Sequence, residues 1–218
     1  RQLFEGIEGV ETYIDDLLIW GETKELHDCR LRQVLEMSRA KNFKLNKEKC
    51  KVGLEEIKYL GHIFSKDGLK PDQSKIEAVR KMPTPECKKD VERFLGVVTY
   101  LAKFIPNMSK HTEPLRGLTR DDVEWQWKAE HQQAFNTMKT MLTEAPVLRY
   151  YDVKLPVTLS VDASKSGLGA VLLQELKPVA YASRPLTETE QRYAQIEKEM
   201  LAIVFGAERF RQITKRLK

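Results

Sequence analysis

The sequence has few of the residues that build disulfide frameworks and zinc sites. It has three scattered cysteines, Cys29, Cys50 and Cys87, no Cys-x-x-C pair, and four histidines that stand apart from one another. So few cysteines exclude a disulfide scaffold, and the scatter favours free thiols over a zinc site. We therefore expect an intracellular protein.

Long apolar runs, internal repeats and low-complexity tracts are also missing. The longest uncharged stretch is far below the ~18 apolar residues of a membrane span. No charged-then-apolar signal sequence opens the chain, and we expect no membrane partner. The 218 residues are 41% hydrophobic and 32% charged, which is typical of a soluble globular protein of one large or two small domains.

Net charge is only a weak guide to a partner. The formal charge is +5, and Arg211, Lys215, Arg216 and Lys218 supply four of these charges. An excess of this size points only mildly toward an anionic ligand. Any prediction of nucleic-acid binding therefore has to come from motifs.

The first third of the chain predicts a hairpin, a helix and several strands. Two β-rich runs flank Asp15 and Asp16, which predicts a hairpin with both carboxylates at its tip. Thr23 can cap a helix that runs to about Ala40. Further elements are predicted as strands at 43–45, 57–64 and Leu69, and as a short helix after Pro71-Asp72.

The middle of the chain predicts a small helical bundle between two proline-marked boundaries. Residues 82–85 read Met-Pro-Thr-Pro, which fits a helix cap followed by proline at the first helical position. That helix is expected to end before Pro106, with Leu95, Val98 and Leu101 in its core. A second helix is expected over 129–142, and the second boundary lies between 145 and 156.

The last third predicts the start of an α/β unit. Strands are expected at 157–161, ending on Asp162, and at 169–174 and 179–183. A long amphipathic helix is expected from Glu188 to about Phe210. We expect its apolar stripe to consist of Tyr193, Ile196, Met200, Val204, Ala207 and Phe210.

Two adjacent carboxylates between apolar strands have two interpretations. They can hold a divalent metal against substrate phosphates, or they can be an ordinary exposed Asp-Asp turn. The dipeptide alone favours the turn.

The surrounding residues change that balance. Residues 9–19, Gly-Val-Glu-Thr-Tyr-Ile-Asp-Asp-Leu-Leu-Ile, resemble the Y-x-D-D signature of reverse transcriptases in its Ty3/gypsy-type long-terminal-repeat retrotransposon version. Blocks at 45–50, 59–63, 68–72, 94–106 and 161–204 follow in the family's order and approximate spacing. The resemblance covers nearly the whole chain up to about Arg211.

The resemblance implies the C-terminal half of a polymerase palm over residues 1–82. Asp15 and Asp16 then match the Y-x-D-D metal-binding pair of a two-magnesium centre, and Tyr13 matches the residue beside the template–primer end. Tyr59, Gly61 and His62 belong to a segment that resembles the primer grip. On its own, His62 reads as a half-exposed strand residue.

Residues 83–149 resemble the thumb, whose first helix would follow the minor groove of the duplex. Gly96 would allow close backbone approach, Tyr100 would pack on a sugar, and Glu92 falls on the same face. For the apolar positions of this helix, a core role is favoured over a contact role.

Residues 150–218 resemble the first part of a ribonuclease H domain. Asp162 matches the first metal-binding acid of that site. Periodicity leaves Glu197 and Glu199 both open as the helical acid, and the family pattern of glutamate two residues before leucine-alanine-isoleucine selects Glu199. The alternative for Glu197 is a solvated helix charge.

The resemblance thus implies a multidomain α/β (α+β) fold with a partial palm, a helical thumb and an incomplete ribonuclease H-like mixed sheet with a helix. It implies Mg²⁺, an RNA template, a DNA primer, dNTPs and an RNA–DNA hybrid in the intact parent, located in a cytoplasmic particle or the nucleus. An earlier palm aspartate and a third ribonuclease H acid are not among these blocks, so we expect this chain alone to perform neither reaction well. We also expect the region after residue 150 to be protease-sensitive in isolation.

Two alternatives remain at this point. The chain could be a non-enzymatic retroelement relic that binds nucleic acid or is inert. A generic α/β interaction protein would require the ordered motifs to be coincidence.

Overall fold

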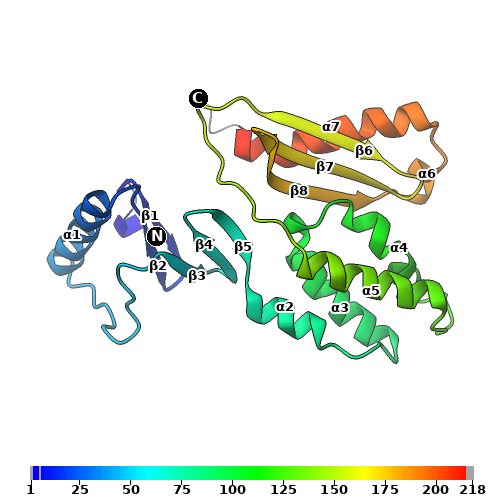
Figure 1. Cartoon of the computed structure of the whole chain (residues 1–218), viewed down its shortest axis with the longest axis horizontal. Helices are drawn as coiled ribbons and strands as arrows, with labels where there is room; N and C mark the ends of the chain where they lie inside the picture. The colour runs from blue at the N-terminus through cyan, green and yellow to red at the C-terminus, as the bar shows by residue number, and fades with distance from the viewer. Residues whose placement is uncertain (1, 5, 215–218) are drawn as a thin grey trace. The chain divides into compact units, whose positions relative to one another are not determined.

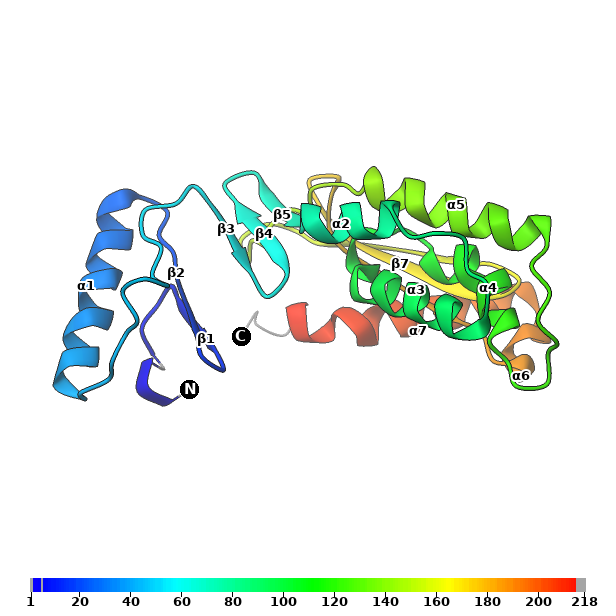
Figure 2. The same ribbon diagram turned by 90° about the horizontal axis from the view of Figure 1, so that it is seen from below.

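A computed structural model describes residues 2–4 and 6–214, and the chain divides into two compact units, residues 1–59 and 60–218. Lys215, Arg216 and Lys218, which supply much of the net charge, lie outside the described residues. Figures 1 and 2 show the elements of each unit from two directions. Within the described residues, none of the helices is long and apolar enough to cross a membrane.

The first unit is built on the predicted hairpin and helix. Its elements are η1 (Gln2–Phe4), β1 (Val10–Tyr13), β2 (Asp16–Ile19), α1 (Lys24–Ala40) and β3 (Glu56–Tyr59). Thr23 caps α1 as predicted, because its hydroxyl accepts a hydrogen bond from the Leu26 amide at 3.2 Å. The predicted strand at 43–45 is wrong: it lies in an exposed loop where the described chain has no partner strand for it.

The second unit begins with a hairpin and four helices. These are β4 (His62–Ser65), β5 (Gly68–Pro71), α2 (Gln73–Arg80), α3 (Lys88–Tyr100), η2 (Ala102–Phe104), α4 (Met108–Leu118) and α5 (Ala129–Thr143). The strand predicted over 57–64 is interrupted because Leu60 and Gly61 both have positive φ, 48° and 69°. The helix predicted from Thr84 begins only at Lys88, after Cys87 as N-cap.

A single core cluster holds these helices together. Val98, Leu101, Phe104 and Leu115 are fully buried in it, and Leu95 is 7% exposed, so the predicted core role of the α3 positions is confirmed. Helix α4 was not predicted because Pro114 stands inside it and proline usually ends a helical pattern.

The rest of the second unit is a three-stranded antiparallel sheet with two helices. The strands β6 (Thr158–Ala163), β7 (Gly167–Gln174) and β8 (Lys177–Pro185) lie in sequence order, followed by α6 (Glu188–Gln191) and α7 (Gln195–Thr214). Helix α7 packs along β6 and β7, whereas α4 packs along β8 and β7 (Figure 1).

The predicted apolar stripe of the last helix is confirmed at Phe210, which is 4% exposed in the core, and wrong along the rest of the helix. Ile196, Met200 and Val204 are 70%, 57% and 51% exposed, and the single long helix is split into α6 and α7. The face that meets the sheet instead carries Ala202 and Gly206, four residues apart. Small side chains there let the helix approach Leu159, Val161 and Ala170 closely, and this close packing decides which face turns inward.

Polar contacts join α4 to the sheet within the second unit. The Ser109 amide donates to the Ser183 hydroxyl at 3.1 Å, and the Ser109 hydroxyl donates to the Leu168 carbonyl at 3.4 Å. A Cβ at Gly169 would occupy the place of the Asn107 side-chain oxygen, so glycine lets the Asn107 side chain lie directly against β7. Hydrogen bonds and packing therefore hold the β6–β8 sheet against α4 of the helical bundle.

Candidate functional site

The predicted acid pair lies at the tip of the β1–β2 hairpin. Tyr13 pairs with Asp16 as the last residues in register, so Ile14 and Asp15 form the two-residue turn. Ile14 has φ 51° and is 85% exposed. A β-branched residue in this left-handed region is costly, and such strain is concentrated at functional sites. The side chains of Asp15 and Asp16 are both exposed, so a cation can reach them from solvent.

Tyr59 lies in the electrostatic field of this tip. Burial raises the pKa of its phenol, and the carboxylates of Asp16 and Glu11 and the side chain of Tyr13 raise it further. The protonated phenol can therefore donate a hydrogen bond beside the acid pair. Tyr13 itself is 49% exposed, which leaves its ring available to a ligand.

Arg30 supports the base of the hairpin and was not singled out from the sequence. It is 7% exposed, its Nη1 donates to the Trp20 carbonyl at 2.7 Å, and its Nη2 lies 3.3 Å from Glu8 Oε1. Its guanidinium occupies the space that a side chain at Gly9 would need. Arg30 shares the buried face of α1 with Val34 and Ser38, and an arginine adds nothing to the apolar periodicity of that face.

The predicted grip turn is fastened to α3 in the second unit. Tyr100 Oη donates to the Leu60 carbonyl at 2.6 Å, and a Cβ on Gly61 would collide with the same hydroxyl. The Lys75 ammonium lies 4.2 Å from the centre of the Tyr100 ring. The turn and the helix therefore present one surface.

His62 is buried rather than half-exposed. It is 9% exposed, stacks on Tyr100 with ring centres 5.3 Å apart, and packs against Phe104 at 5.6 Å. Burial lowers its pKa to about 4, helped by the positive charges of Lys103 and Lys75 and opposed by Asp72. His62 is thus a neutral ring that supports Tyr100 at neutral pH.

Three predicted nucleic-acid positions share the outer face of α3. Glu92, Gly96 and Tyr100 are spaced four residues apart and all are exposed. No atom lies within 4 Å of the place that a Gly96 side chain would occupy. The backbone at Gly96 is therefore open to close approach by a ligand.

The second acid pair comes from β6 and α7. Asp162 is exposed and pairs with Gly169 in the sheet, and Glu199 is half-buried on the first turns of α7. The side-chain amide nitrogen of Gln195, Nε2, donates to Glu199 Oε1 at 2.7 Å. It also donates to the carbonyl of Ala163, the residue after Asp162, at 3.0 Å. The Glu197 carboxylate instead accepts the Ala194 amide at 2.8 Å and so caps its own helix.

The donor chemistry of both acid pairs fits a divalent cation. Mg²⁺ is commonly held by one or two carboxylates together with water and substrate phosphates. Groups of three or more histidine, cysteine, aspartate or glutamate side chains suited to a metal are not found in the described part of the chain. Each unit thus offers two carboxylates to a cation.

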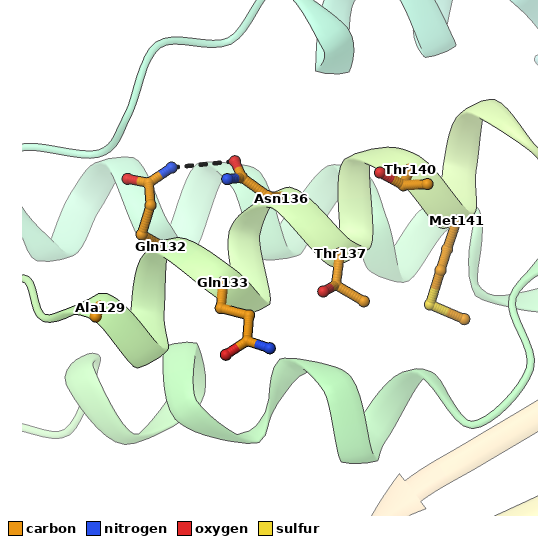
Figure 3. A pocket seen from close by; sticks show the side chains of 7 residues that line it. All are labelled: Ala129, Gln132, Gln133, Asn136, Thr137, Thr140 and Met141. Atoms are coloured by element: carbon orange, nitrogen blue, oxygen red, sulfur yellow. Dashed lines mark hydrogen bonds between the residues drawn. The ribbon is translucent and has the colours of Figure 1, made fainter.

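A shallow groove along α5 is a weaker candidate. Its volume is about 570 Å³, and Figure 3 shows the side chains that line it, with Gln132 hydrogen-bonded to Asn136. Its lining consists of Ala129, Gln132, Gln133, Asn136, Thr137, Thr140 and Met141. None of these side chains titrates near neutral pH, so the groove offers no proton or metal chemistry.

Comparison with known proteins gives two family matches. Residues 2–64 match the family described as reverse transcriptase (RNA-dependent DNA polymerase), and residues 127–218 match the RNase H-like domain found in reverse transcriptase. Both families typically use divalent metals.

Curated relatives are transposon polyproteins. The chain is 35% identical over 207 residues to the Tf2-3 polyprotein of Schizosaccharomyces pombe, and 34% identical to the Tf2-7 polyprotein of the same organism. The match covers 93% of this chain but only 16% of each polyprotein.

Solved structures confirm the fold. The foamy viral protease-reverse transcriptase dRH in complex with dsDNA matches with a TM-score of 0.87 at 23% identity, over 97% of this chain and 38% of that one. The foamy viral protease-reverse transcriptase in complex with RNA/DNA hybrid matches with a TM-score of 0.84 at 23% identity, over 95% and 29%. The predicted α/β (α+β) fold class is therefore confirmed, and the chain belongs to the reverse transcriptase and RNase H-like segment of retrotransposon polyproteins.

Proposed function

We propose that this chain supplies two separate carboxylate pairs to nucleic-acid chemistry in its intact parent. Asp15 and Asp16 serve RNA-directed DNA synthesis from an RNA template, a DNA primer and dNTPs. Asp162 and Glu199 serve cleavage of the RNA strand of an RNA–DNA hybrid. The main support for this proposal is that each pair lies within one of the two family matches and that its side chains are exposed or half-buried.

The residues around each pair have distinct tasks. Asp15 and Asp16 would bind Mg²⁺, as would Asp162 and Glu199, and Mg²⁺ supplies charge stabilisation for phosphoryl transfer. Tyr13 and Tyr59 border the first pair with aromatic rings. The outer face of α3 offers Gly96 for close backbone approach to a duplex and Tyr100 for packing on a sugar, while Glu92 lies on that face as a negative charge.

Hybrid binding by the 218-residue chain tests this proposal. Fluorescence anisotropy with an RNA–DNA hybrid should show binding that weakens as salt rises, because the phosphate contacts release counterions. Binding that is absent at low salt, or insensitive to salt, would overturn the proposed nucleic-acid role.

A second candidate is nucleic-acid binding without turnover by this chain alone. It is supported by the lack of a three-ligand group among the described side chains, because two-metal chemistry relies on shared carboxylates. We expect the 218-residue chain to bind a hybrid but to extend no primer. Magnesium-dependent primer extension that Asp15→Asn abolishes would contradict this second candidate.

A further inference from the structure

The Gln195 side chain lies between the two elements that carry the second acid pair. It stands at the start of α7, four residues before Glu199 and therefore one turn away on the same face. Its amide reaches Glu199 Oε1 at 2.7 Å and the Ala163 carbonyl at 3.0 Å. One side chain thus joins the carboxylate on the helix to the end of the strand that carries Asp162.

The chemistry of the partners fixes the orientation of this amide. The Ala163 carbonyl and an ionised Glu199 carboxylate can only accept hydrogen bonds. An amide nitrogen has two N–H groups, so both of them are used and the flipped orientation would place two acceptors against the amide oxygen. Only an amide or a similar double donor can make this bridge.

Glu197 has no comparable tie to the strand. Its carboxylate accepts the Ala194 amide at the beginning of α7, within its own helix. Glu197 and Glu199, between which periodicity could not choose, therefore have different hydrogen-bond partners. Glu197 is held by the start of its own helix, whereas Glu199 is connected to β6 through Gln195.

We infer that Gln195 is a positioning residue that ties the Glu199 carboxylate to the end of β6, the strand that carries Asp162. Without this bridge, a glutamate side chain has three rotatable bonds and would sample several rotamers. Outer partners that orient a metal-binding carboxylate commonly change metal affinity when they are removed. This inference rests on the proposed role of Asp162 and Glu199 and adds the residue that holds one of them.

A double-mutant cycle on the full 218-residue chain tests the bridge without metal. The variants are Gln195→Ala, Glu199→Ala and both together, and urea unfolding is followed for each. We expect a coupling of about two- to fivefold in the unfolding equilibrium constant, since the hydrogen bond is charge-assisted but exposed. Additive effects of the two changes would overturn the inference.

Mn²⁺ binding, followed by electron paramagnetic resonance, tests the consequence. Gln195→Ala should weaken the Asp162-dependent Mn²⁺ site about tenfold, and it should have no further effect in the Glu199→Ala background. Asn136→Ala is the matched control, because it removes the acceptor of an i,i+4 side-chain hydrogen bond on α5 (Figure 3) and should leave Mn²⁺ binding unchanged.

The two measurements separate this inference from the proposed function. If urea unfolding shows coupling but the unmutated 218-residue chain binds no Mn²⁺, the Gln195 bridge stands and the proposed metal site is overturned. Mn²⁺ binding that Glu199→Ala weakens but Gln195→Ala does not would overturn the positioning role while keeping the metal site.

Discussion

The two units of this chain differ in how their acid pairs are supported. In the first unit, buried apolar side chains are few, with Phe4, Leu18 and Val34 among them, and the acid pair needs only one hairpin turn. In the second unit, three hydrophobic clusters hold helices and a sheet, and its acid pair comes from a strand and a helix. A local motif can therefore place carboxylates without a core, whereas acids from distant segments require tertiary packing.

The first prediction has the largest expected effect and asks whether the two acid pairs serve separate reactions. In the intact parent enzyme, Asp15→Asn should lower primer extension on the order of a thousandfold, because a metal contributes several kcal/mol to such a transition state. Cleavage of the RNA strand should stay near its normal rate. Asp162→Asn should have the reverse effect, and equal loss of both reactions in either variant would contradict the division.

The second prediction concerns the protonation of His62 in the second unit. The pKa of His62 is lowered from 6.5 to about 4, so the unfolded chain binds more protons than the folded one between these values. The stabilisation that the neutral His62 side chain gives the folded state is complete above pH 6.5. It is lost as the pH falls toward 4, which lowers the free energy of unfolding by about 1–3 kcal/mol.

Urea unfolding at pH 7 and pH 4.5 measures this loss. Trp125 and Trp127 pack against the core of the second unit, so a Trp20→Phe background makes fluorescence report that unit. The control variant His62→Phe keeps an aromatic ring beside Tyr100 and should lose less stability between the two pH values. The same pH dependence in both proteins would rule out His62 as its source.

The third prediction separates stability from binding on the α3 surface. Gly96→Ala should stabilise the second unit by about 0.5–1 kcal/mol, because alanine favours a helix and the space there is open. It should also weaken duplex binding several-fold, since a methyl group would stand where the proposed interface brings the backbone of α3 against the ligand.

Gly117→Ala on α4 is the matched control, because that position is also helical and open. It should raise stability by a similar amount and leave binding unchanged. Unchanged duplex binding by Gly96→Ala would remove Gly96 from the proposed interface.

The fourth prediction concerns the hydrogen bond that joins the grip turn to α3. Tyr100→Phe removes the hydrogen bond to the Leu60 carbonyl but keeps the ring on His62. We expect a loss of about 0.5–1.5 kcal/mol in the free energy of unfolding, measured in urea. A loss near zero would show that the turn keeps its geometry without this bond.

Local signals in the sequence predicted much of the fold. The acid hairpin, the Thr23 cap and the helix over 129–142 depend on neighbouring residues, and the structure has all three. The helix start at Thr84 was wrong because the proline-rich segment stays extended until Cys87, where Asp90 accepts the Glu86 amide.

Features that depend on distant segments could not be read from periodicity. The inward face of α7 depends on how closely Gly206 approaches the sheet. Apolar periodicity found Phe210 on that face but also selected Ile196, Met200 and Val204, which are exposed. His62 is buried by Tyr100 and Phe104, which lie some forty residues further along the chain. The roles assigned to the site residues, the division into modules at 82 and 149, and the protease sensitivity of the isolated region after residue 150 stay predictions.

The most direct test is a Mn²⁺ titration of the isotope-labelled 218-residue chain, followed by amide NMR line broadening. We expect two separate broadened patches, one around Asp15 and Asp16 and one around Asp162 and Glu199. Asp162→Asn should remove only the second patch. Broadening confined to other segments, or loss of both patches in that variant, would contradict the claim that this chain carries two independent metal-facing acid pairs.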